Sequence, residues 1–157
     1  MQILVDEDAA AQNSRLTGIR LAILAARLVE LWRRDVHDVQ NAMIIVAVIA
    51  ITSEKLTRAE LPPEHRTLEN YLPLEQLQKC NVSSIAAATG LNRETARRRV
   101  EALIKAGSLI KTPEGEIALP PERVQEPAAL ALVRKQLEAV TRFVNDGLRD
   151  GIFELRG

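Results

Sequence analysis

Three features are scarce in this chain of 157 residues, and each scarcity narrows the classes of protein to consider. Cys80 is the only cysteine, which excludes an intramolecular disulfide and a thiolate metal cluster and favours a reducing cytoplasm as the compartment. Aromatic residues make up only 3% of the chain, whereas the helix-favouring residues Ala, Leu, Arg and Glu are abundant. Neither sign of charge is in excess, because 21 basic residues balance 21 acidic ones, so no global field attracts nucleic acid.

The sequence also lacks the residue patterns that catalysis and cofactor binding require. It contains no glycine-rich phosphate loop, and no Ser-His-Asp or Cys-His set in a recognisable context. The two histidines, His37 and His65, lie far apart, and neither has the spacing of a metal ligand. We therefore expect no catalytic residue, no metal site and no cofactor, and we expect the protein not to be an enzyme.

The apolar segments are too short for a membrane protein. Residues 1–12 lack the basic start and the long apolar core of a secretory signal. Residues 42–51 are all apolar, but they have about half the length that a membrane span needs. Because 46% of the chain is apolar and can form a core, we expect residues 42–51 to lie in a buried helix, and we expect no membrane partner.

The most informative stretch is residues 82–119, which begins with two short predicted helices across a tight turn. Ser83 or Ser84 is expected to cap the first helix, and Gly90 is expected to end it with a left-handed backbone. Asn92 is expected to cap the second helix, since its side chain accepts an amide hydrogen at a helix start. The sequence therefore predicts a helix, a turn and a second helix.

A β-hairpin is expected directly after the second helix. Residues 109–112 and 116–119 are short β-prone runs on either side of Pro113-Glu114-Gly115, which favours a turn. A helix, a turn, a helix and a hairpin in this order form a winged helix-turn-helix. The predicted fold class is mainly α with a small β-hairpin, in which this head is flanked by N- and C-terminal dimerisation helices.

The residues of the turn and the second helix, GLNRETARR over Gly90 to Arg98, resemble the recognition helix of catabolite-activator-type bacterial regulators. In that family an Arg-Glu-Thr-x-x-Arg run reads a G·C-containing half-site, with arginine on guanine and glutamate on cytosine. The resemblance implies base-reading roles for Arg93, Glu94 and Arg98. It covers about a quarter of the chain and does not extend to that family's cyclic-nucleotide β-barrel, so the family's ligand is not transferred.

Other polar residues of the head are expected to contact DNA phosphates, because such contacts fix the register of a protein on the duplex. Basic residues are concentrated locally: six lie between positions 92 and 111 against two glutamates. Glu114 and Glu116 make the short wing acidic, which argues against deep insertion into the minor groove. The expected DNA-backbone residues are Ser83, Ser84, Thr95, Arg97, Arg99, Lys105 and Lys111.

Two helices are expected before the head. Residues 14–34 carry apolar residues over so broad a surface that the helix must be covered on more than one side, most simply by a partner subunit. A second helix is expected over residues 36–55, capped by Asp35, and residues 57–72 with Pro62-Pro63 are expected to link it to the head. Residues 1–12 are expected to be a loose arm or one short strand at 2–5, and shorter elements are expected at residues 74–79 (helical turn) and 80–82 (strand).

A final helix is expected after the wing, with Pro127 at its first position. Its apolar residues follow the 3-4-3-4 spacing of a heptad seam, which is too short for a free-standing coiled coil. The seam is therefore expected to pack on the N-terminal helices, within the chain or across a dimer. The expected dimer-interface residues are Ile23, Leu28, Trp32, Leu130, Val133, Leu137, Val140 and Val144.

The sequence thus predicts three parts: dimerisation helices over residues 1–61, a DNA-binding winged helix-turn-helix over 62–120, and a C-terminal packing helix over 121–157. The predicted function is a cytoplasmic, homodimeric transcriptional regulator that binds a pseudo-palindromic site in double-stranded DNA. Two alternatives stay open. The head could bind an acidic protein instead, or a small-molecule effector could bind between the helices and the head, although no polar residues suggest a pocket there.

Overall fold

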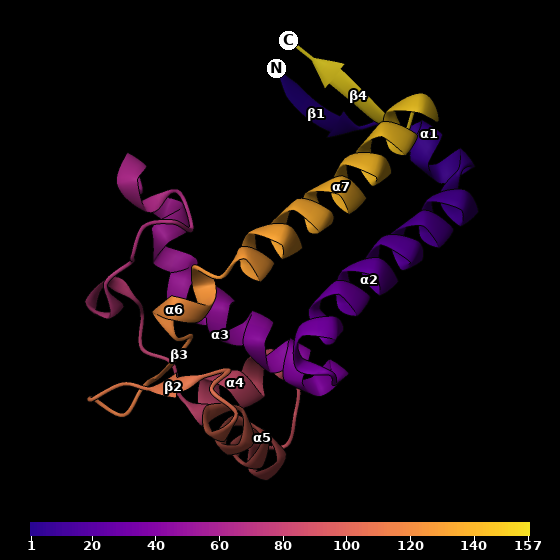
Figure 1. The fold of residues 1–157 in the computed structure, drawn as a ribbon. Helices are drawn as coiled ribbons and strands as arrows, with labels where there is room; N and C mark the ends of the chain where they lie inside the picture. Colours follow the sequence, from indigo (N-terminus) through magenta and orange to yellow (C-terminus); the bar gives the residue numbers. More distant parts are fainter. The chain divides into compact units, whose positions relative to one another are not determined.

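The computed structural model describes all 157 residues, and 66% of them are helical. Two small antiparallel sheets are present, one pairing β1 with β4 and the other pairing β2 with β3 (Figure 1). The predicted class, mainly α with a small hairpin, is confirmed at this level. In chain order the elements are β1 (Gln2–Val5), α1 (Glu7–Gln12), α2 (Ser14–Val36), α3 (Val39–Arg58), η1 (Pro63–His65), η2 (Leu74–Gln76), α4 (Val82–Thr89), α5 (Arg93–Lys105), β2 (Ile110–Lys111), β3 (Ile117–Ala118), α6 (Pro121–Val124), α7 (Pro127–Arg149) and β4 (Phe153–Arg156).

The chain forms two compact units. Unit 1 comprises Met1–Trp32 and Leu132–Gly157, and unit 2 comprises Arg33–Ala131. The boundaries expected at residues 61/62 and 120/121 both fall inside unit 2, because α3 packs on α4, α5 and β3. Helix α3 therefore shares a core with the head.

Unit 2 is organised around α3. Asp38 caps this helix, its carboxylate accepting the backbone N–H of Asn41 at 2.9 Å, so the expected cap at Asp35 is wrong. The reason lies in His37, whose left-handed backbone (φ 58°) separates the end of α2 from the start of α3. The largest fully buried side chains of this unit are Ile44, Val48, Cys80, Ile85, Val100 and Leu109.

The apolar segment 42–51 lies within α3, and five of its ten residues are buried. Three residues are exposed: Met43 at 41%, Val46 at 39%, and Ala50. By length and composition alone α3 is apolar enough to cross a membrane, and 33% of its most apolar window is buried. Core helices share these properties, and α3 makes the contacts of a core helix with α4, α5 and β3.

The expected β-hairpin is present, with shorter strands than expected. Ile110 pairs with Ala118 and Lys111 with Ile117, and the turn between the strands contains Gly115 at φ 83°. The strand expected at residues 80–82 does not form, since Val82 already belongs to α4. The carbonyl of Cys80 nevertheless accepts the Ile117 N–H at 2.8 Å, so this segment still runs beside β3.

Unit 1 joins the two ends of the chain. The expected strand at residues 2–5 is confirmed, and its partner is β4, in a register from Gln2↔Arg156 to Val5↔Phe153. The Phe153 ring packs edge-on against Phe143 of α7, with ring centroids 5.8 Å apart. The sheet is therefore anchored on the end of α7 (Figure 1).

Gly147 of α7 is required by this packing. A Cβ built on Gly147 would overlap the Phe153 ring. Gly147→Ala should lower the free energy of unfolding by about 1–3 kcal/mol, because the ring must move to admit a methyl group. Thermal unfolding followed by circular dichroism measures the effect.

The matched control for that substitution is Gly18→Ala in α2. A Cβ at Gly18 meets nothing within 4 Å, so alanine should stabilise this helix by up to about 1 kcal/mol. Equal unfolding midpoints for the two variants would contradict the packing described for Phe153.

Candidate nucleic-acid interface

Helix α4 begins with a capping box. The Asn81 side chain accepts the backbone N–H of Ser84 at 3.0 Å, and the Ser84 hydroxyl accepts the backbone N–H of Asn81 at 3.0 Å. The expected cap at Ser83 or Ser84 is therefore wrong, because Asn81 holds that position and Ser84 is the third helical residue. Gly90 ends the helix in the left-handed region (φ 70°), as expected.

Helix α5 has one buried side and one solvent-exposed side. Asn92 caps it as expected, accepting the Glu94 N–H at 2.9 Å. Ala96, Val100 and Leu103 are buried, and α5 packs on α3 and α4. The opposite side of the helix is thereby held in contact with solvent.

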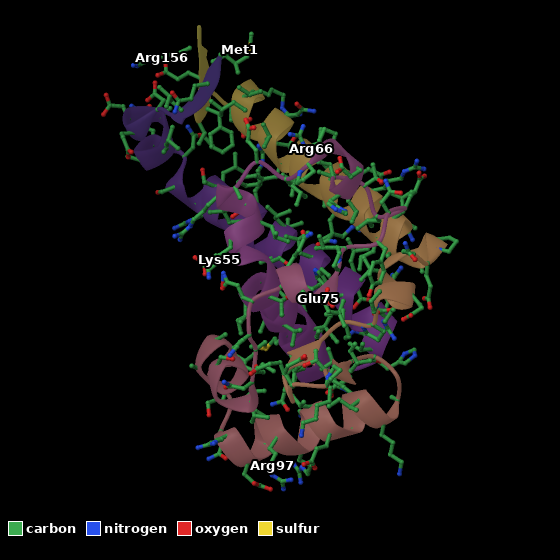
Figure 2. The ribbon with its side chains drawn as sticks, turned by 90° about the vertical axis from the view of Figure 1, so that its left-hand side faces the viewer. Met1, Lys55, Arg66, Glu75, Arg97 and Arg156 are labelled. Atoms are coloured by element: carbon green, nitrogen blue, oxygen red, sulfur yellow. The ribbon has the colours of Figure 1, made fainter.

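All three expected base-reading residues lie on the exposed part of α5. Arg93 and Arg98 make no hydrogen bond or ion pair in the structure, so their guanidinium groups are open to a ligand. The Glu94 carboxylate is instead bound by Arg97, with Nε to Oε2 at 3.0 Å. Arg97 also donates to Glu101 at 2.6 Å, and it lies on the outer side of α5 (Figure 2).

This pairing has an electrostatic consequence for Glu94. Hydrogen bonds from the Arg97 guanidinium lower the pKa of the Glu94 carboxyl, and the charges of Arg97 and Arg98 act in the same direction. The pKa of Arg97 is raised by hydrogen bonds to Glu94 and then to Glu101. Glu94 is therefore held as a carboxylate, which can only accept hydrogen bonds.

The expected phosphate-binding residues fall into two groups. Ser83, Lys105 and Lys111 are exposed, and Thr95 is half-buried in the first turn of α5. The Ser84 hydroxyl is occupied by the capping box. The remaining two, Arg97 and Arg99, are both bound to acidic residues of the chain.

Arg99 is directed at α3. Its Nη1 donates to the Asp38 carboxylate at 2.9 Å and to the Asn41 side chain at 3.1 Å, and 28% of the Arg99 side chain is exposed. Since Asp38 is also the cap of α3, one carboxylate fixes both the start of α3 and the middle of α5. Arg99 therefore positions α5 within the structure.

A second arginine binds the same corner of the chain. Arg123 of α6 donates to the Asp35 carboxylate at 2.6 Å and to the Ser108 hydroxyl at 3.1 Å. Neither this contact nor the contact between Arg99 and Asp38 is predicted by the sequence. The paired residues lie 88 and 61 positions apart, and no local spacing signals such pairs.

The expected dimer-interface residues differ in exposure. Ile23 and Leu137 are the most exposed, at 63% and 60%. Leu28, Trp32 and Val144 are half-buried, and Trp32 donates its indole N–H to Gln136 at 2.9 Å. The other members, Leu130, Val133 and Val140, are 42%, 40% and 39% exposed.

The side chains give little support for a metal site, a reactive thiol or an enclosed ligand pocket. No group of three or more His, Cys, Asp or Glu is placed to hold a metal ion. Burial raises the pKa of the Cys80 thiol, which keeps it protonated and unreactive. A depression along α7 beside Leu137 is open to solvent and lined by one helix only.

Comparisons with known proteins add no relative: no family model, no curated protein and no solved structure matches the chain.

The role of Arg99 can be tested by a double-mutant cycle with Asp38. Arg99→Ala should cost about 1 kcal/mol, because the lost hydrogen bonds are charged but partly exposed to solvent. Asp38→Ala should cost more, since it also removes the cap of α3. The double variant should cost less than the sum of the two single variants in urea-induced unfolding.

Arg98→Ala is the matched control, because Arg98 lies next in the chain and makes no ion pair in the structure. It should change stability by less than about 0.5 kcal/mol. Additive effects of Arg99→Ala and Asp38→Ala, or equal costs for Arg98→Ala and Arg99→Ala, would reject the positioning role.

Proposed function

We propose that the protein is a sequence-specific DNA-binding transcriptional regulator, and that α4, α5 and the β2–β3 hairpin form a winged helix-turn-helix. One observation carries the proposal: α5 is capped and buried on one side, its solvent-exposed side presents Glu94 and Arg98, and Arg93 is exposed at its N-terminal end. A rigid, exposed helix of this kind suits the major groove, which is wide enough to admit it. The proposal invokes no catalysis and assigns the protein to the cytoplasm.

The chemistry of the three side chains matches base edges. Arg93 and Arg98 can each donate two hydrogen bonds to guanine O6 and N7, and the Glu94 carboxylate can accept from the amino group of cytosine. Ser83, Thr95 and Lys105 would hold phosphates beside the groove, and Lys111 would place the hairpin on the backbone. Two copies of α5 would enter successive major grooves about 34 Å apart, on a pseudo-palindromic site.

Hydrogen bonds within the chain reduce the number of side chains that we propose as phosphate contacts. We exclude Ser84 and Arg99 from it, because the first is bound in a capping box and the second is bound to Asp38 and Asn41. We also reassign Arg97, whose guanidinium holds the Glu94 carboxylate, to orienting Glu94 for base reading. Fewer phosphate contacts imply a shallow salt dependence, so base contacts must supply much of the affinity.

Arg98→Ala tests the base-reading role. It should weaken binding to the preferred duplex by about 1–3 kcal/mol and relax base preference at one position, because a bidentate contact to guanine is lost. Lys105→Ala, the control on the same helix, should weaken all sequences alike and reduce the slope of log affinity against log salt by about 1.8, which is about 0.9 for each of the two copies. Fluorescence anisotropy on labelled duplexes at several salt concentrations separates the two.

Equal losses on all sequences from Arg98→Ala would contradict its role. If the wild-type protein binds no duplex at any salt concentration, the arginines of α5 serve another partner. An acidic protein is then the alternative for this surface, and the DNA-binding proposal is rejected.

Arg97→Ala tests whether Arg97 orients Glu94 or contacts a phosphate. We expect the preference for cytosine at the position read by Glu94 to fall while the salt slope stays unchanged, because no phosphate contact is lost. Glu101→Gln is the control, since it removes the other partner of Arg97 and leaves the Arg97–Glu94 pair intact. A salt slope reduced by about 1.8 in Arg97→Ala, about 0.9 for each copy, would show a phosphate contact instead.

A further inference from the structure

Unit 1 has almost no core of its own. Among Met1–Trp32 and Leu132–Gly157, only Leu31, Gly147 and Ile152 are buried. Ordering each residue of a chain costs about 1–2 kcal/mol, which must be offset mainly by apolar burial. Three buried residues are too few to offset that cost. We therefore expect more of the apolar surface of unit 1 to be buried against another molecule or segment.

Helix α2 carries an apolar stripe on its solvent-exposed side. The stripe consists of Ile19, Ala22, Ala26 and Val29, all exposed and at 3-4-3 spacing. It lies opposite Leu24, Leu28 and Leu31, the less exposed side of the same helix. The two alanines at its centre would let another helix approach closely.

Helix α7 exposes a second apolar stripe, the heptad seam expected from the sequence. Leu130, Val133, Leu137 and Val140 are each between 39% and 60% exposed. The side of α7 used inside unit 1 is different: Gln136 accepts the hydrogen bond from Trp32, and Phe143 packs on Phe153. The seam therefore has the spacing of a helix–helix contact and remains largely exposed to solvent.

The charges beside this seam favour a second copy as the occupant. Arg134 and Glu138 line the depression next to Leu137, so both signs occur within one helical turn. A copy of α7 laid antiparallel across Leu137 keeps the same flank of both helices together and brings each Arg134 near the partner's Glu138. The charges on this side of α7 are therefore complementary to those on a second, antiparallel copy.

We propose that unit 1 is one half of a shared core: a second copy of this chain covers the α2 stripe and the α7 seam, and folding of unit 1 is coupled to that association. The inference goes further than the two copies of the proposed function, because it assigns the surface at which they meet and couples that contact to folding, and it does not depend on the arginines of α5. It also replaces two expected interface residues, Leu28 and Trp32, with Ile19 and Val29 on the exposed side of α2.

Sedimentation equilibrium and thermal unfolding of the full chain without DNA test the proposal. We expect a dimer whose unfolding midpoint rises with protein concentration, because association stabilises only the folded state. A monomer with a concentration-independent midpoint would overturn the proposal. That result would mean that unit 2 of the same chain, or a different protein, covers these stripes.

Leu137→Glu identifies the surface. It should raise the dimer dissociation constant about 30-fold or more, as expected when a charge enters the centre of an apolar contact. Lys135→Glu on the polar side of α7 is the control and should leave the constant unchanged. A dimer equally strong in Leu137→Glu would place the interface elsewhere and overturn the proposal.

Leu137→Ala keeps the test decisive if Leu137→Glu fails to fold, because alanine favours helix. Its unfolding midpoint should be lower than that of the wild type and should recover as protein concentration rises. A lowered midpoint that does not change with concentration would overturn the proposal. A stable dimer that binds no DNA would reject the proposed function and leave this inference intact.

Discussion

The burial of one side of α5 is the constraint on which the functional argument depends. Ala96, Val100 and Leu103 pack into the core around α3, and this contact decides which side of α5 meets solvent. Removing that apolar surface from water is the main favourable term, and it fixes the rotation of the helix about its axis. Arg98 lies on the remaining surface and Arg93 at the exposed start of the helix, so the packing of α5 also decides which side chains are available for the base reading that we propose.

Two arginines extend this constraint beyond the apolar core. Arg99 joins α5 to Asp38 at the start of α3, and Arg123 joins α6 to Asp35 at the end of α2. Both bind the short corner in which His37 has a left-handed backbone. Charged hydrogen bonds are directional, so they fix the position of α5 in a way that apolar contacts alone do not.

The elements that could be predicted from the sequence are those set by local chemistry. Asn92, Gly90 and Pro127 act within a few residues, and the helix ends they predict are confirmed. The cap of α3 could not be predicted, because Asp35 and Asp38 are equally suited by residue type and the left-handed backbone of His37 decides where α2 ends and α3 begins. The pairing of β1 with β4, and the binding of Arg97 and Arg99 to acidic partners, likewise depend on which segments the fold brings together.

The proposal that the solvent-exposed side of α5 reads DNA sequence is tested most directly by selecting bound duplexes from a pool of random DNA sequences. We expect enrichment of a pseudo-palindrome that contains G·C pairs and whose half-sites lie about one helical turn, roughly 34 Å, apart. A pool that shows no enriched sequence after repeated rounds, at a salt concentration where the protein is folded, would contradict the proposal.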